Sequence, residues 1–139
     1  ISNIVGIKEA TGDLLRLRDL IELCGDEFDY YSGDDMTALD FILAGGKGNI
    51  SVTANVVPDK MQRMCQAANS ADETQARSLN NEIEALHSDL FLEANPIPVK
   101  WALYEMGMIK TGIRLPMTPL AKQYREQLKL TMKKMGVLN

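Results

Sequence analysis

The sequence is poor in the residues that build metal sites and disulfide frameworks. It has one histidine and two cysteines in 139 residues. No CxxC or HExxH pattern is present, so the spacing that zinc ligands need is missing. Cys24 and Cys65 stand apart at positions of apolar helical periodicity, and we expect reduced core thiols, as in a cytosolic protein. His87 falls in a polar helical segment, which predicts no part in chemistry.

Long apolar runs and concentrated positive charge are missing as well. The apolar stretches are far shorter than the roughly 20 residues of a membrane-spanning helix, and no signal peptide is visible. The formal net charge is −4, without a basic stripe, which argues against a nucleic-acid surface. We therefore expect a cytoplasmic protein that binds neither membranes nor nucleic acid. The net charge does not exclude small anionic substrates, because local positive charge matters more for their binding than the charge of the whole chain.

The N-terminal part of the chain alternates short apolar runs with amphipathic segments. The apolar runs predict β-strands at 4–7, 28–32 and 48–52, and the segments between them predict helices at 14–24 and 37–43. A cap within Thr11-Gly12-Asp13 and stops at Gly25 and at Gly45-Gly46 support these limits. Such alternation is typical of parallel strands joined by right-handed crossover helices.

Beyond residue 56 the pattern is helical only. Helices are predicted from Pro58 onward, then at 71–90, 98–106 and 119–135. The last of these carries an apolar stripe at helical spacing. Hydrophobic residues make up 45% of the chain, enough for the packed core of one domain.

Three parallel strands are an incomplete sheet. They leave two unpaired edges and two faces to be covered, which a closed barrel of eight βα units in roughly 250 residues achieves. We therefore expect an α/β fold: the C-terminal half of a TIM (β/α)8 barrel, with three parallel strands and crossover helices, plus a C-terminal helical extension. Residues 1–56 would supply the last βα units, and residues 57–139 a helical region that includes the closing barrel helix. The start at Ile1 resembles the middle of a longer protein.

Lys8 is the strongest candidate for chemistry. It follows the apolar run 4–7 and precedes a helix start, so it emerges where parallel α/β folds collect their active sites. A lysine among apolar neighbours loses its proton readily, and the neutral amine attacks a carbonyl carbon to form a Schiff base. The ordinary alternative is a solvated lysine whose stem lies on apolar atoms. Glu9 adjoins Lys8, but we expect it to face away and pair structurally, because neighbours in a strand point to opposite faces.

Six motifs in order along the chain resemble the dihydrodipicolinate synthase family, also called the 4-hydroxy-tetrahydrodipicolinate synthases. The motifs are Gly6-Ile7-Lys8-Glu9-Ala10-Thr11-Gly12, Ser32-Gly33-Asp34-Asp35, Leu39-Asp40-Phe41, the glycine-rich stretch from Gly45 to Asn55, Asn95-Pro96-Ile97-Pro98-Val99-Lys100-Trp101 and Arg114-Leu115-Pro116-Met117-Thr118-Pro119-Leu120. One such motif is weak evidence, whereas six with matching gaps along essentially the whole chain are specific.

The resemblance implies a TIM barrel that condenses pyruvate with aspartate semialdehyde, the entry step of lysine and diaminopimelate biosynthesis. Lys8 matches the family's Schiff-base lysine. Ile50 matches a residue whose backbone lies beside bound pyruvate, and Gly33 lies on the loop near the second substrate. No metal or organic cofactor is implied, only a covalent pyruvate adduct on Lys8. The intact family forms homodimers and commonly homotetramers, with the helix near Leu14 as an expected contact surface.

Some family features do not occur in this chain. They are a Gly-Thr-Thr-Gly-Glu type segment that helps hold the pyruvate carboxylate, a tyrosine proton relay and an arginine for the second substrate. We therefore expect the chain alone to be catalytically incomplete. Two alternatives stay open: another lysine-dependent pyruvate aldolase such as N-acetylneuraminate lyase, and a non-catalytic half-barrel that docks with a complementary half. Asp34 and Asp35 adjoin each other without further ligands, so we expect them to cap a loop.

Overall fold

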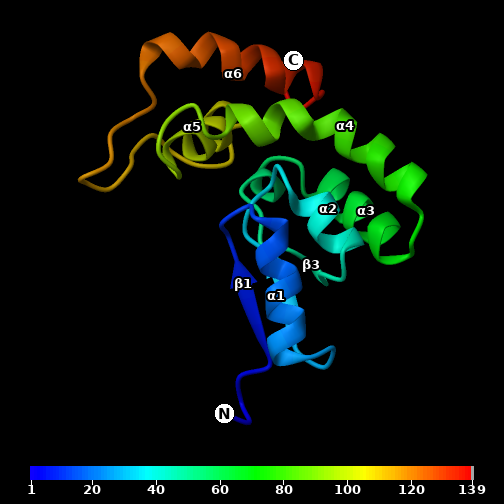
Figure 1. The fold of residues 1–139 in the computed structure, drawn as a ribbon. Helices are drawn as coiled ribbons and strands as arrows, with labels where there is room; N and C mark the ends of the chain where they lie inside the picture. The colour runs from blue at the N-terminus through cyan, green and yellow to red at the C-terminus, as the bar shows by residue number, and fades with distance from the viewer. Residues whose placement is uncertain (139) are drawn as a thin grey trace.

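The structure is a computed structural model that describes residues 1–138. The strands lie in the N-terminal part and the C-terminal part is helical (Figure 1). In chain order the elements are β1 (Gly6–Glu9), α1 (Leu14–Cys24), β2 (Asp29–Ser32), α2 (Ala38–Leu43), β3 (Gly48–Asn49), the 3-10 helix η1 (Thr53–Asn55), α3 (Pro58–Asn69), α4 (Glu73–Asp89), α5 (Ile97–Glu105) and α6 (Lys122–Lys134).

The three strands form one parallel sheet in the order β1-β2-β3. Lys8 pairs with Tyr31, and Tyr31 pairs with Gly48. The helices α1 and α2 lie in the two connections between the strands. The predicted arrangement of parallel strands with crossover helices is therefore confirmed.

All three strands differ in their limits from the prediction, and β2 differs least, because it begins at Asp29 instead of Phe28. Pairing of β1 begins at Gly6 rather than Ile4, so Lys8 lies inside the strand instead of after it. Ile4 and Val5 precede the strand and are 54% and 66% exposed, although the Val5 carbonyl accepts the Asp29 amide at 2.8 Å. β3 ends already at Asn49, because the chain turns toward η1 and is held there by side chains described below.

Local capping sets both ends of α1, as the sequence predicts. The Leu15 amide donates to Asp13 Oδ1 at 2.9 Å. Gly25 ends the helix with a φ of 80°, a left-handed conformation that glycine adopts freely. The Tyr30 hydroxyl lies 2.7 Å from the Gly25 carbonyl, so β2 is tied to the end of α1, and Leu17 packs against Tyr30 in a small core.

A larger core joins α2 to the helices that follow it. The helices α3 and α4 pack along each other, and α6 lies on α4 (Figure 1). Leu128 and Met132 of α6 are fully buried in this layer, which confirms the predicted stripe. The buried members are Leu39, Ile42, Val56, Val57, Met61, Met64, Ala68, Ala76, Leu79, Ile83, Leu86, Leu90, Ile97, Val99, Ala102, Leu120, Leu128 and Met132.

Cys24 and His87 differ from their predictions. Cys24 is exposed rather than in the core, because it ends α1 beyond the packed turns. Cys65 is half-buried, and both thiols are free. His87 is only 1% exposed, because it follows the buried Leu86 and shares the inward face of α4 with Ile83.

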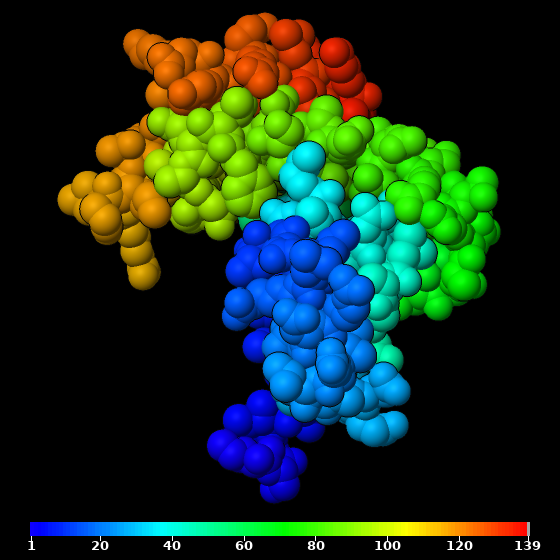
Figure 2. All heavy atoms as spheres, viewed as in Figure 1, coloured from blue at the N-terminus to red at the C-terminus, as the bar shows by residue number. Residues whose placement is uncertain are grey.

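The N-terminal residues form a lobe that projects from the helical layer (Figure 2). No helix within residues 1–138 has the combination of length and hydropathy that crossing a bilayer requires. The division of the chain between residues 56 and 57 stays a prediction, and the large core draws on both sides of it, through Ile42 and Met61 for example.

We predict that Leu128→Ala lowers the free energy of unfolding by about 3 kcal/mol, because it leaves a cavity beneath α6. Leu130→Ala is the matched control on the same helix. Leu130 is 49% exposed, so its loss should cost less than about 1 kcal/mol. Urea unfolding followed by circular dichroism measures both variants, and equal midpoints would contradict the packing.

Candidate functional site

One face of the sheet carries the residue expected to act. Side chains alternate along a strand, so the register places Lys8, Tyr31 and Gly48 on the same face. Glu9 and Ser32, which pair with each other, point to the opposite face, and both are buried. The sheet therefore has one packed face and one face that carries the lysine.

The side chain of Lys8 lies against the backbone of Gly33. A Cβ atom added to Gly33 would lie 2.5 Å from Lys8 Cε and 2.6 Å from Ala10 Cβ, closer than real side chains approach. The Gly33 amide donates to the Glu9 carbonyl at 2.7 Å, which extends the pairing of β1 with β2 beyond the strands. Glycine at position 33 is therefore explained by close approach, and the structure brings two of the predicted site residues together.

Ile50 lies on the same face, just past the end of β3. Its amide donates to the Ser32 carbonyl at 2.8 Å, and alternation from Gly48 directs its side chain toward the face of Lys8. Ile50 is 52% exposed, and Lys8 is exposed as well. Apolar neighbours were expected around Lys8, but residues 1–138 leave this end of the sheet open. The ends of three neighbouring strands thus carry Lys8, Gly33 and Ile50. No other part of residues 1–138 covers these residues on that face.

Glu9 faces away from Lys8, as predicted. Its Oε1 accepts the Thr11 amide at 3.0 Å and lies 3.4 Å from Arg16 Nε. Glu9 is 6% exposed, whereas the Arg16 side chain is 60% exposed. The carboxylate therefore joins β1 to the start of α1 and is not placed to move a proton for Lys8.

Asp34 and Asp35 have different roles. Asp34 caps a loop, as predicted, because its Oδ2 accepts the Thr37 amide and hydroxyl at 3.0 and 2.8 Å. Asp35 is 2% exposed and instead connects the ends of two strands. Its carboxylate accepts the Asn49 side-chain amide at 2.7 Å and the backbone amides of Val52 and Thr53 at 3.0 and 2.9 Å. Within residues 1–138, no group of three or more His, Cys, Asp or Glu residues is arranged to hold a metal ion.

His87 extends these contacts toward the helical layer. Its Nδ1 lies 2.9 Å from Thr53 Oγ1, and its buried Nε2 has no hydrogen-bond partner among the described residues. Burial lowers the pKa of His87 from its usual 6.5, and the carboxylates of Asp35, Glu84 and Asp34 only partly oppose this. The imidazole is therefore neutral at pH 7. No local pattern indicates this contact, because 34 residues separate the two partners.

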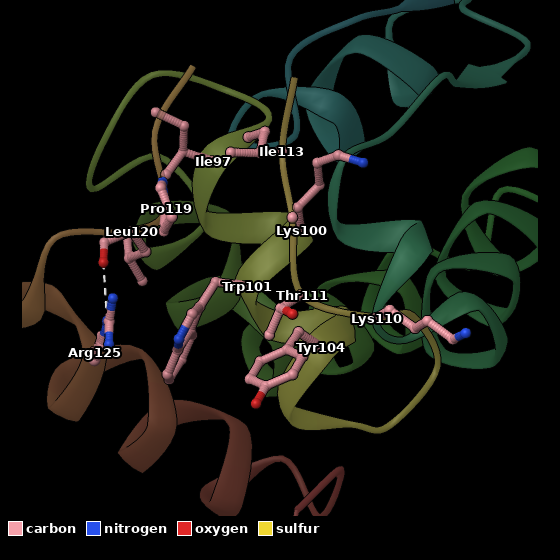
Figure 3. A pocket seen from close by; sticks show the side chains of 11 residues that line it. Ile97, Lys100, Trp101, Tyr104, Lys110, Thr111, Ile113, Pro119, Leu120 and Arg125 are labelled. Carbon is pink, nitrogen blue, oxygen red and sulfur yellow. Dashed lines mark hydrogen bonds between the residues drawn. The ribbon is translucent and has the colours of Figure 1, made fainter. Parts of the chain in front are cut away.

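A cavity of about 230 Å³ lies elsewhere, between α5, α6 and the loop that joins them (Figure 3). Trp101 is half-buried and lines the cavity. Arg125 Nε donates to the Leu120 carbonyl at 2.9 Å, and the amino ends of Lys100 and Lys110 point away from the indole ring (Figure 3). None of the three predicted site residues lines this cavity.

Comparison with known families agrees with this geometry. The model of the dihydrodipicolinate synthetase family matches residues 1–135. The chain belongs to this family. Curated proteins named 4-hydroxy-tetrahydrodipicolinate synthase are 61% identical to it in Alcanivorax borkumensis and 56% identical in Thioalkalivibrio sulfidiphilus, over 99% of the chain in each case. The chain spans about half the length of these relatives, 47% of each.

Solved structures of this family match the fold closely. Dihydrodipicolinate synthase from Acinetobacter baumannii, a chloride-inhibited enzyme solved with pyruvate, has a TM-score of 0.94 at 57% identity and covers 98% of this chain. The Aquifex aeolicus enzyme has a TM-score of 0.95 at 35% identity, also over 98% of this chain. The chain covers 47% and 46% of these two structures. The expected fold class and family are therefore confirmed, and the described fold is about half of the family's.

We predict that Gly33→Ala displaces the Lys8 side chain and lowers the free energy of unfolding by about 1–3 kcal/mol, because the new methyl group overlaps Lys8 Cε and Ala10. Gly48→Ala is the matched control, since its methyl group would meet Tyr31 at 3.7 Å, an ordinary contact. Urea unfolding gives the two stabilities, and NMR of the Lys8 Cε resonance reports the displacement. Equal stabilities with an unchanged Lys8 resonance would refute the close approach.

We predict that His87→Gln reduces the acid sensitivity of the fold. The pKa of His87 is lower in the folded chain than the 6.5 of a free imidazole. At a pH between these two pKa values, the unfolded chain binds a proton that the folded chain does not. The free energy of unfolding therefore decreases as the pH falls through this range. The loss approaches about 1.4 kcal/mol per pH unit. Urea midpoints at about pH 7.5 and about pH 5.5 should differ more in the original chain than in the variant. An equal difference in both would contradict a buried neutral imidazole.

Proposed function

We propose that this chain carries the Schiff-base lysine of a cytoplasmic lyase that condenses pyruvate with aspartate semialdehyde. The observation that supports this best is the Lys8 side chain lying against Gly33 at the open end of the parallel sheet. The chain that holds this arrangement is 61% identical to a 4-hydroxy-tetrahydrodipicolinate synthase. The reaction would be the first committed step of lysine and diaminopimelate biosynthesis.

The proposed chemistry needs an amine and no metal or organic cofactor. The uncharged Nζ of Lys8 attacks the ketone carbon of pyruvate, and loss of water gives an iminium ion. The iminium withdraws electrons, so the methyl carbon loses a proton and an enamine forms. The enamine carbon attacks the aldehyde carbon of aspartate semialdehyde and joins the two substrates. The substrate's own amine then attacks the iminium carbon, closes the ring and displaces Lys8.

Gly33 and Ile50 receive supporting roles in this proposal. Pyruvate is present in the structure of the Acinetobacter baumannii enzyme, which is 57% identical to this chain. We place pyruvate beside the Ile50 backbone, on the face that Lys8 occupies, and the second substrate near the loop of Gly33. Neither position adds a reactive group, so both would act by orienting the substrates near the amine.

Activity would require the part of the family fold that this chain does not match. The chain spans 47% of its relative from Alcanivorax borkumensis, and its lysine-bearing face is open. The family's carboxylate-holding segment, tyrosine relay and arginine would complete the site. We expect the complete protein to form homodimers or homotetramers. A monomeric variant of the family, 36% identical to this chain, has been solved with a TM-score of 0.91.

A second candidate is a half-barrel that associates without catalysis. It is favoured by the exposed apolar residues Ile4 and Val5 leading into β1, which are 54% and 66% exposed. A complementary half-barrel would cover them. The two candidates differ in whether the assembled site turns over substrate. A sialic acid cleavage assay on the same sample tests the related alternative, an N-acetylneuraminate lyase.

The test uses a chimera in which this chain replaces the matching 47% of the Alcanivorax borkumensis enzyme. We predict that the chimera condenses pyruvate with aspartate semialdehyde. Lys8→Arg should lower kcat at least about 1,000-fold, because guanidinium stays protonated and cannot attack the ketone. Lys47→Arg is the matched control, since Lys47 is exposed just before β3, and it should leave kcat within about twofold.

A coupled assay that reduces the cyclic product measures these rates. Retained activity in Lys8→Arg would show that another group is the nucleophile. A folded chimera without condensation would favour the non-catalytic half-barrel, and cleavage of sialic acid in place of condensation would favour the lyase.

A further inference from the structure

A continuous set of hydrogen bonds joins α4 to the turn that carries Ile50. His87 on α4 contacts Thr53 at the start of η1, Nδ1 to Oγ1, at 2.9 Å. The backbone amide of Thr53 donates to Asp35 at 2.9 Å. Asp35 follows β2, on the loop that begins with Gly33. The contacts therefore connect the helical layer with the ends of two strands.

The turn around Ile50 is held on both sides by this set. On one side, the Asn49 side chain donates to Asp35 Oδ1 at 2.7 Å. On the other, the amides of Val52 and Thr53 donate to Asp35 Oδ2. Within residues 1–138, the hydrogen bond of Ile50 is the one from its amide to the Ser32 carbonyl at 2.8 Å, and Ile50 is 52% exposed. The placement of the Ile50 backbone therefore depends on the residues on either side of it.

The imidazole of His87 is a rigid support for Thr53. His87 is 1% exposed, and its helical neighbours Ile83 and Leu86 are fully buried in the large core. The helix packs along α3 on one side and against α6 on the other. Movement of the ring would therefore require a rearrangement of the helical layer, whereas Thr53 follows an irregular turn.

Stability alone does not explain an imidazole at this position. Its Nε2 is buried without a hydrogen-bond partner within residues 1–138, which is an unfavourable state for a polar atom. An apolar side chain of similar volume would avoid this cost. The one polar contact that the ring makes in the described chain is with Thr53. The imidazole therefore acts through its hydrogen bond with Thr53, which fixes the start of the η1 turn.

We infer that His87 is a positioning residue for the pyruvate site, acting through Thr53 on the Ile50 backbone. This inference rests on the proposed function for the identity of the ligand, but the mechanical link lies entirely within this chain. His87 lies on α4 and is buried, and its hydrogen bond within residues 1–138 is to Thr53 rather than to Lys8, Gly33 or Ile50.

The kinetic test compares three substitutions in the chimera defined above. His87→Leu should raise the KM for pyruvate about fivefold, the effect of one lost hydrogen bond, while kcat and the KM for aspartate semialdehyde stay within about twofold. His87→Asn places an amide near the position of Nδ1. Its KM for pyruvate should therefore lie close to that of the chimera that keeps His87. Ile83→Val, a buried change on the same helix, costs about 1 kcal/mol of stability and should leave every KM unchanged.

A double-mutant cycle with Thr53→Val assigns the effect to the contact. If His87 acts through Thr53, adding Thr53→Val to His87→Leu raises the pyruvate KM no further than either change alone. Additive effects would overturn the inference. So would a His87→Leu enzyme whose pyruvate KM matches that of Ile83→Val.

Amide hydrogen exchange on the 139-residue chain tests the link without any activity. His87→Leu should speed exchange at Ile50 at least about fivefold relative to Tyr31 in β2, whereas Ile83→Val should leave that ratio unchanged. An unchanged ratio in His87→Leu would overturn the inference even if the enzyme is active. An inactive chimera with the predicted exchange pattern would instead contradict the proposed function and support the mechanical link.

Discussion

The parallel pairing of β1 with β2 is the constraint on which the rest of the structure depends. Its register sets Lys8 beside Tyr31 and continues to the Gly33 amide, which donates to the Glu9 carbonyl at 2.7 Å. The same pairing sends the amine to the open face and the Glu9 carboxylate to the packed face. A slip of one residue would exchange them and would lose the contact of Lys8 with Gly33.

The open end of the sheet explains why half of the family fold can hold the proposed nucleophile, Lys8, without completing the site. Lys8 and Ile50 are exposed because no layer within residues 1–138 faces them. The relatives are about twice as long, as the chain spans 47% of the Alcanivorax borkumensis protein. A covering layer would exclude water from the face that carries Lys8. It would also cover the exposed apolar residues that lead into β1.

Local signals predicted most of the fold, and distant contacts account for what they missed. The limits of α1 followed from Asp13 and Gly25, whose capping effects act within one turn. The predicted third strand was too long, because Asp35 draws the chain into a turn from 17 and 18 residues away. The burial of His87 had a local signal, its place on the face of α4 that carries Ile83, whereas its contact with Thr53, 34 residues away, had none. Lys8 was predicted both from its place after an apolar run and from motif resemblance, whereas the roles of Gly33 and Ile50 came from the resemblance; the structure adds that the three share one face.

The most direct test of the account is the site of the covalent adduct. The chimera is treated with pyruvate and borohydride, which reduces the imine to a stable secondary amine, and its peptides are sequenced by mass spectrometry. The account predicts that the three-carbon adduct is found on the peptide containing Gly6-Ile7-Lys8-Glu9 and is assigned to Lys8. An adduct confined to a different lysine, or none in a chimera that condenses the substrates, would contradict it.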